Sequence, residues 1–168
     1  MSVGISFKPV SHHSARVLIL GSMPGVKSLS ANEYYAHPRN SFWQIMSASI
    51  GFEPAISYKA KLDVLTQSGI ALWDVLHSCT RLGSLDSGIE KGTRIANDFN
   101  AFLIAHPNIE LGCFNGAEAE KSYNEYVLPK LAENKVRYVR LPSTSPTHAA
   151  LSFDEKLQAW TTVIDSDM

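Results

Sequence analysis

Two polar stretches of this sequence contain the groups that could bind and activate a ligand. Residues 21–40 begin with Gly-Ser-Met-Pro-Gly and end with Tyr-Ala-His-Pro-Arg-Asn, and residues 141–149 read Leu-Pro-Ser-Thr-Ser-Pro-Thr-His-Ala. A Pro-Gly turn exposes backbone N–H groups, which can receive an oxygen atom of a ligand. Hydroxyl groups and free N–H groups suit phosphates. Both stretches therefore indicate a site for polar ligand groups.

Several common chemistries have no motif in this sequence. There is no G-x-x-x-x-G-K-[ST] phosphate loop, and no G-x-G-x-x-G follows the first apolar run. Gly21-Ser22-Met23 does not form the G-x-S-x-G turn of serine hydrolases. The histidines lack metal-ligand spacing, and Cys79 and Cys113 form no C-x-x-C pair. We therefore expect an enzyme with no metal, no cofactor and no serine ester intermediate.

The first stretch lies between a predicted strand and a predicted helix. Residues 17–20 are Val-Leu-Ile-Leu, an apolar run expected of a strand that is buried on both faces. A helix with apolar residues at helical spacing begins at Asn40 or Ser41 and stops at Gly51. A long loop thus joins the carboxyl end of a buried strand to a helix, and open α/β sheets bind ligands at that edge.

The rest of the chain alternates predicted strands with predicted helices. The strand patterns are residues 70–76, 109–114 and 136–141, and the helical patterns are 58–67, 95–105, 117–131 and the segment after a Ser152–Glu155 capping box. Residues 1–15 are expected to form an extended lead-in. This order predicts one domain, residues 1–168, with a parallel sheet and helices on both faces. The unusual loops, which should converge on one crevice, follow strand ends at 21–39, 77–92, 115–116 and 142–150.

The composition is that of an ordinary globular protein, with 45% hydrophobic and 18% charged residues. The net charge of −1 argues against a duplex-binding protein, which usually has a basic face. Basic residues do cluster at 59–61, 81–94 and 130–140, but such runs are more often solvated faces. No apolar run is long enough to span a membrane and no signal peptide opens the chain, so we expect a cytoplasmic location and no membrane partner.

The two stretches resemble the two motifs of the uracil-DNA glycosylase superfamily. G-S-M-P-G followed by Y-Y-A-H-P-R-N-S-F-W is similar to the first motif, and L-P-S-T-S-P-T-H-A to the second. The likeness is greatest to the hypoxanthine (deoxyinosine) DNA glycosylase branch. It implies an α/β fold, a three-layer α/β/α sandwich around a small, mainly parallel four-stranded sheet. It also implies a monofunctional base-excision-repair enzyme that flips out a deaminated base, hypoxanthine above all, and hydrolyses its N-glycosidic bond by water attack.

The resemblance assigns roles to five residues. Ser22 and Met23 fall in the turn that receives the base. Tyr35 falls where the family has its base-stacking aromatic residue, and Asn115 where it has its base-reading asparagine. Met23 replaces a water-positioning asparagine of the mismatch-specific relatives, and the hypoxanthine branch is similar in lacking that residue. Asn40 is then the expected catalytic residue, which orients a water molecule, and it can also cap the following helix.

The second motif is expected to hold the DNA backbone. Its expected DNA-binding residues are Pro142, Ser143, Ser145, Pro146 and His148. The large apolar side chain that the superfamily wedges into DNA is missing here, which leaves Pro146, Thr147 or His148 to fill the gap. No lysine stands in either motif core to act as a Schiff-base nucleophile, so strand cleavage is not expected. Asp74, the nearest carboxylate, lies at a strand end and is expected to be structural.

The sequence leaves three further functions open. The first is a uracil- or mismatch-specific DNA glycosylase, and the second is a hydrolase of free nucleosides or nucleotides. The third is a catalytically inactive nucleic-acid-binding module, which Met23 makes credible and which predicts salt-sensitive binding without base release. The expected partner is DNA that contains deaminated bases, and the chain is expected to act as a monomer.

Overall fold

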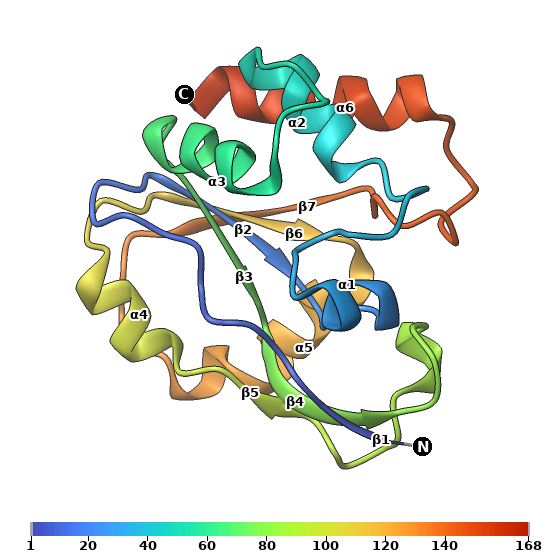
Figure 1. Cartoon of the computed structure of the whole chain (residues 1–168). Coiled ribbons are helices and arrows are strands. Elements are labelled where there is room, and N and C mark those ends of the chain that lie inside the picture. The colour runs from blue at the N-terminus through green and yellow to red at the C-terminus, as the bar shows by residue number, and fades with distance from the viewer. Residues whose placement is uncertain (1, 168) are drawn as a thin grey trace.

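The computed structural model describes residues 2–167 and is built around a four-stranded parallel sheet (Figure 1). Its strands, in the order β3-β2-β6-β7, are β2 (Val17–Gly21), β3 (Ile70–Asp74), β6 (Leu111–Asn115) and β7 (Arg137–Leu141). The register pairs Gly21 with Asp74 and Asn115 with Leu141. Because the strands are parallel, their carboxyl ends share one edge of the sheet.

Two groups of helices cover the two faces of this sheet (Figure 1). One face carries α2 (Phe42–Ile50), α3 (Tyr58–Gln67) and α6 (Phe153–Asp167), and the other carries α4 (Phe99–Ala105) and α5 (Ala117–Tyr126). Alternate strand residues enter the two cores: Ile19 belongs to the cluster of Trp160, and Leu20 to the cluster of Tyr123. The predicted three-layer α/β/α sandwich is confirmed.

Local sequence signals explain where the helices begin and end. In the capping box before α6, the Ser152 N–H donates to Glu155 Oε1 (3.0 Å) and the Glu155 N–H donates to Ser152 Oγ (3.2 Å). Helix α2 ends at Gly51, whose φ of 80° is in the left-handed region that glycine adopts without strain. Helix α5 stops before the 3₁₀ turn η2 (Leu128–Lys130), where proline cannot continue a helix.

A second, antiparallel sheet corrects the prediction for three segments. Its strands, in the order β1-β4-β5, are β1 (Ser2–Ile5), β4 (Leu76–Arg81) and β5 (Ile95–Ala96). They replace part of the expected lead-in, part of the expected loop and the first residues of an expected helix. In β4, Leu76 and Cys79 are buried whereas His77 is exposed. Because β4 contains several polar residues, the sequence pattern indicated a loop where the structure has a strand.

Two short helical segments also interrupt loops that were expected to be irregular. They are α1 (Val26–Ala31) and the 3₁₀ turn η1 (Asp86–Gly88). Both lie near the carboxyl edge of the parallel sheet (Figure 1). None of the helices among residues 2–167 combines the length and apolar character that crossing a bilayer requires.

Candidate active site

A cavity of about 330 Å³ opens at the carboxyl edge of the parallel sheet. Asp74 and Asn115, at the ends of β3 and β6, line it. The remaining walls come from within residues 21–28, 34–40, 84–86 and 143–147. The two stretches selected for their chemistry therefore meet in one cavity, as the convergence of strand-end loops predicted.

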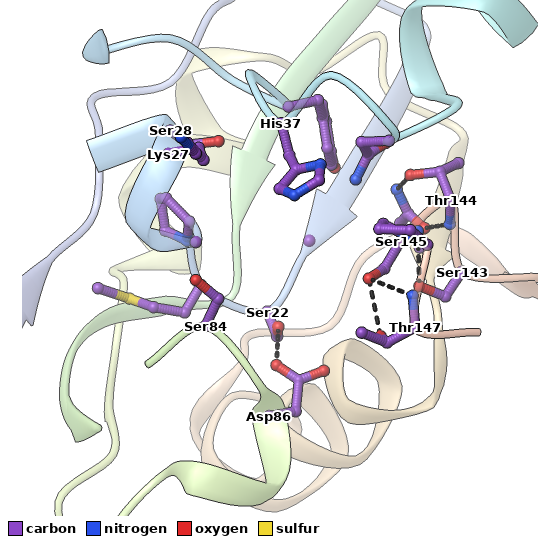
Figure 2. Close-up of a pocket in the computed structure, with 18 of the residues that line it drawn as sticks. Ser22, Lys27, Ser28, His37, Ser84, Asp86, Ser143, Thr144, Ser145 and Thr147 are labelled. Carbon is purple, nitrogen blue, oxygen red and sulfur yellow. Dashed lines mark hydrogen bonds between the residues drawn. The ribbon is translucent and has the colours of Figure 1, made fainter. Parts of the chain in front are cut away.

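Figure 2 shows how the labelled side chains surround this space. Ser143, Thr144, Ser145 and Thr147 form one side of it, and Ser22 and Asp86 lie across from them. His37 points into the space between these groups. The surroundings are mostly hydroxyl, amide and carboxyl groups, which suit a polar ligand that hydrogen-bonds along its edge.

Buried residues of β4 hold the Gly-Ser-Met-Pro-Gly turn in place. Arg81 is only 6% exposed, and its guanidinium group donates a hydrogen bond to the Pro24 carbonyl oxygen. The Met23 side chain is 7% exposed and packs in a cluster with Leu76 and Cys79 beneath the turn. The thioether of Met23 therefore anchors the turn to the second sheet, while the same residue still forms part of the cavity wall.

The loop before η1 is fastened to the same turn at two points. The Ser22 hydroxyl donates to Asp86 Oδ1 (2.7 Å), and the Val26 N–H donates to Ser84 Oγ (2.8 Å). Leu85 stands between these two anchors, lines the cavity and is 50% exposed. The sequence predicted that the loop at residues 77–92 would reach this crevice, but it did not single out residues 84–86, because the loop carries no motif and their partners lie more than 55 positions away.

Tyr35 lies where the resemblance placed a stacking aromatic residue. Its ring stacks on Phe42, with ring centroids 4.0 Å apart and an interplanar angle of 24°. Its φ of 57° is unusual for a residue with a side chain, and such strain often occurs at functional sites. Burial raises the pKa of the Tyr35 phenol, so the hydroxyl is neutral. A hydrogen bond with the Asn115 side chain opposes this rise in pKa.

Asp74 is the more deeply buried of the two aspartates that line the cavity, and it lies beside Tyr35. The residue is 3% exposed, and its Oδ2 has no hydrogen-bond partner in the described part of the chain. Burial raises the pKa of the Asp74 carboxyl to about 7, the positive charge of Arg81 opposes this rise, and the negative charge of Asp86 adds to it. The carboxyl is thus poised between its acid and its ionised form near neutral pH.

The side-chain amide of Asn115 joins β6 to the second motif through two hydrogen bonds to Thr144. Its Nδ2 donates to Thr144 Oγ1 (3.0 Å), and its Oδ1 accepts from the Thr144 N–H (2.9 Å). These bonds occupy two of the four hydrogen-bonding positions of the amide, and the Tyr35 hydroxyl interacts with a third. Thr144, 1% exposed, was not predicted, because nothing in the sequence distinguishes it from the flanking serines.

Asn40 lines the cavity and also supports the start of α2. Its Oδ1 accepts from the Phe42 N–H (3.0 Å), whereas Ser41, the residue before the helix, makes no side-chain cap. The Ser41 N–H instead donates to the Thr144 carbonyl oxygen (3.0 Å). The helix that carries Asn40 at its entrance is therefore tied directly to the second motif.

The second motif contributes three of its five expected residues to the cavity. Ser143, Ser145 and Pro146 line it, whereas Pro142 and His148 do not. The Pro142 carbonyl oxygen accepts from Trp160 Nε1 (2.9 Å), so this residue fixes the loop to α6. The His148 N–H donates to the Ser145 carbonyl oxygen (3.1 Å) within the turn.

The cations at the cavity are not those of the basic clusters noted in the sequence. Lys27 and Arg39 are exposed and line the cavity. In the predicted clusters, Arg94 forms an ion pair with Glu118 at 2.9 Å, and Arg81 is buried under the turn. Residues 2–167 contain no group of three or more histidine, cysteine, aspartate or glutamate side chains that could hold a metal ion.

Comparisons with known proteins agree with this geometry. The family profile described as the uracil DNA glycosylase superfamily matches residues 7–164. Hypoxanthine DNA glycosylase from Methanosarcina acetivorans is 35% identical over 147 residues, which cover 87% of this chain and 89% of that protein. The protein of the same name from Methanosarcina barkeri is 38% identical over 114 residues, 67% of this chain and 71% of that one. The solution NMR structure of a candidate uracil DNA glycosylase from M. acetivorans superposes with a TM-score of 0.82, at 30% identity and 98% coverage of both chains.

Proposed function

We propose that this chain, which belongs to the uracil DNA glycosylase superfamily, is a monofunctional DNA glycosylase that removes hypoxanthine from DNA. The two relatives named hypoxanthine DNA glycosylase, at 38% and 35% identity, support this choice of base. The expected resemblance to the superfamily and to its hypoxanthine branch is confirmed by these matches.

The observation that carries the proposal is the cavity at the carboxyl edge of the parallel sheet, which both motifs line. Its volume of about 330 Å³ is that of a small-molecule site, and it lies where α/β sheets bind ligands. A base inside a duplex cannot reach such a cavity, so the nucleotide must be flipped out. The chain is also proposed to act as a monomer.

Cleavage of the N-glycosidic bond puts positive charge on the sugar and negative charge on the departing base. Tyr35, whose ring stacks on Phe42, is proposed to stack against the base. The hydrogen-bonding position of Asn115 that Thr144 and Tyr35 leave open is proposed to bind the polar edge of the base. Asn40 is proposed to orient the attacking water through its Oδ1 atom. The same atom accepts a hydrogen bond from the Phe42 N–H at the start of α2.

The DNA backbone is proposed to lie across the rim of the cavity. Lys27 and Arg39 provide exposed positive charge there, and Ser143 and Ser145 provide hydroxyl groups. These local charges explain how a chain with a net charge of −1 can bind DNA.

Leu85 is proposed to fill the gap that the flipped nucleotide leaves. Proteins that bend or open DNA often insert an apolar side chain between base steps. Leu85 is a large, half-exposed apolar side chain of the cavity wall, and the bonds of Ser84 and Asp86 fix its loop on both sides. It therefore suits this task better than Pro146, Thr147 or His148.

The test is base release from defined duplexes. The protein is incubated with oligonucleotides that contain hypoxanthine, uracil or xanthine, and abasic sites are then cleaved with alkali. We expect hypoxanthine to be released in preference to uracil, with no strand cleavage before alkali. Faster release of uracil in every pairing context would make the chain a uracil- or mismatch-specific glycosylase.

Two further outcomes would point to a different activity. Hydrolysis of free inosine without activity on duplexes would indicate a nucleoside hydrolase. Salt-sensitive binding without release of any base would indicate a binding module.

A further inference from the structure

Two buried oxygen atoms, Asp74 Oδ2 and Tyr35 Oη, lie beside the cavity. Asp74 Oδ2 has no hydrogen-bond partner among residues 2–167, whereas the Tyr35 hydroxyl interacts with the Asn115 side chain. Buried polar groups are almost always satisfied in folded proteins, because leaving one without a partner costs free energy. Asp74 lines the cavity, so a ligand bound there can supply the partner that its carboxyl group lacks.

Gly21 brings these two side chains together. A Cβ atom at position 21 would lie 2.4 Å from Asp74 Oδ1 and 3.2 Å from Tyr35 Oη. The carboxyl and the hydroxyl therefore occupy the space above the same backbone atom, at the end of β2. The strand register, which pairs Gly21 with Asp74, fixes the carboxyl group at the sheet edge. Tyr35 reaches the same space from the loop between α1 and α2, where its ring stacks on Phe42.

Burial favours the acid form of Asp74, while the charges around it act in both directions. Arg81 opposes the acid form from β4; its Nη2 donates to the Pro24 carbonyl oxygen, and its buried Nη1 has no hydrogen-bond partner among residues 2–167. Asp86 adds negative charge from η1, and the phenols of Tyr34 and Tyr35 are neutral because burial raises the pKa of each. Together with desolvation, these groups keep the pKa of the Asp74 carboxyl near 7.

A hydrogen-bond donor at the position of Asp74 would distinguish a deaminated base from an undamaged one. Deamination replaces an exocyclic amino group, a hydrogen-bond donor, with a carbonyl oxygen, an acceptor. A carboxylic acid donates to such a carbonyl, whereas a carboxylate would accept from the amino group of the undamaged base. A carboxylate would also repel the negative charge that grows on the departing base, and a neutral acid would stabilise it.

We propose that Asp74, as a neutral carboxylic acid, donates a hydrogen bond to the carbonyl oxygen that deamination creates, O6 in hypoxanthine. This inference rests on the proposed function and assigns to Asp74 both selection of the damaged base and stabilisation of the leaving group. The proton stays on the carboxyl, so the hydrolysis needs no additional acid or base at this position.

The test is the pH dependence of single-turnover release of hypoxanthine between pH 5.5 and 8.5. The wild-type rate should fall as the pH rises through about 7, because the acid form disappears. Asp74→Asn keeps an N–H donor at every pH. Its profile should be flat, its rate should lie within about tenfold of wild type at pH 6, and it should exceed wild type at pH 8.5. Asp74→Ala removes the donor and should lose about a hundredfold at pH 6.

Two variants serve as controls for other titrating groups. Histidines ordinarily titrate between pH 5 and 8 and His37 also lines the cavity, so the pH profile must persist in His37→Gln. In Asp86→Asn the profile should persist and move to lower pH, because the Asp86 charge raises the pKa of Asp74. A flat profile in either variant would overturn the assignment to Asp74.

The remaining outcomes separate this inference from the proposed function. A folded Asp74→Asn that binds DNA but is inactive at every pH, beside an active wild type, would show that the carboxylate is required and would overturn the inference alone. A wild type that releases no base at any pH would overturn the proposed function itself.

Discussion

Replacement of Asp74 with asparagine should stabilise the fold, and the gain should depend on pH. Burial raises the pKa of this carboxyl from 3.8 to about 7 in the folded chain. Between these values the folded state holds a proton that the unfolded state has released, so stability falls as the pH rises through this window and is constant above it. At about 1.36 kcal/mol for each pH unit, the ionisation of Asp74 should cost roughly 4 kcal/mol of unfolding free energy at pH 8.

The measurement is urea unfolding of wild type and Asp74→Asn at several pH values from 3.5 to 8.5. The difference in unfolding free energy should grow in favour of the variant from about pH 4 to about pH 7 and then stay level. Asp63→Asn, which removes an exposed carboxyl from α3, is the matched control and should show no such trend. A difference between wild type and Asp74→Asn that does not change with pH would refute the reasoning, whatever the activity of the enzyme.

The other predictions concern DNA binding and catalysis. Asn40→Ser should fold, because serine can still accept from the Phe42 N–H, but it should lose roughly a hundredfold in single-turnover rate; a rate near wild type would leave Asn40 as a helix cap alone. Tyr35→Ala should slow base release markedly, since a stacked base is worth about 1–3 kcal/mol, and Tyr35→Phe should be milder. Equal defects in the two variants would assign the main role to the hydroxyl. Leu85→Ala should slow release from duplex DNA more than from single strands, and equal losses on both substrates would exclude a wedge. Ser145→Ala should weaken DNA affinity in a binding titration more than the rate at saturation; the reverse pattern would make it part of the catalytic machinery.

The parallel sheet was predictable because its main strands are short apolar runs that end at turn residues. The run at residues 17–20 became β2, and its neighbour β3 ends at Asp74, two residues before the predicted limit. The antiparallel sheet was not predictable in the same way. β5 has two residues, and β4 mixes exposed and buried polar positions, so neither shows a clear period. The pairing of β4 with β1 depends on contacts across about 75 positions of the chain.

The cavity was predictable in outline, since loops after parallel strands meet at one edge. The loop at residues 77–92 was expected at this edge, but its individual wall residues were not, because Ser84 and Asp86 are placed by hydrogen bonds to residues 22–26 that no local pattern indicates. Asp74 carried a visible signal, an acidic residue that closes the apolar run Ile-Ala-Leu-Trp. Its burial beside Arg81 could be seen only in the folded chain.

The contact between Gly21 and Asp74 also restricts the order in which this sequence can change. A methyl group at position 21 would lie 2.4 Å from Asp74 Oδ1, so a side chain there would force the carboxyl group to shift. A lineage therefore gains a side chain at position 21 at lower cost after it has exchanged Asp74 for a smaller residue. The reverse order passes through an overpacked ancestor with a blocked cavity. Position 74 is thus the permissive site and position 21 the dependent one, and relatives that differ at both should have changed in that sequence.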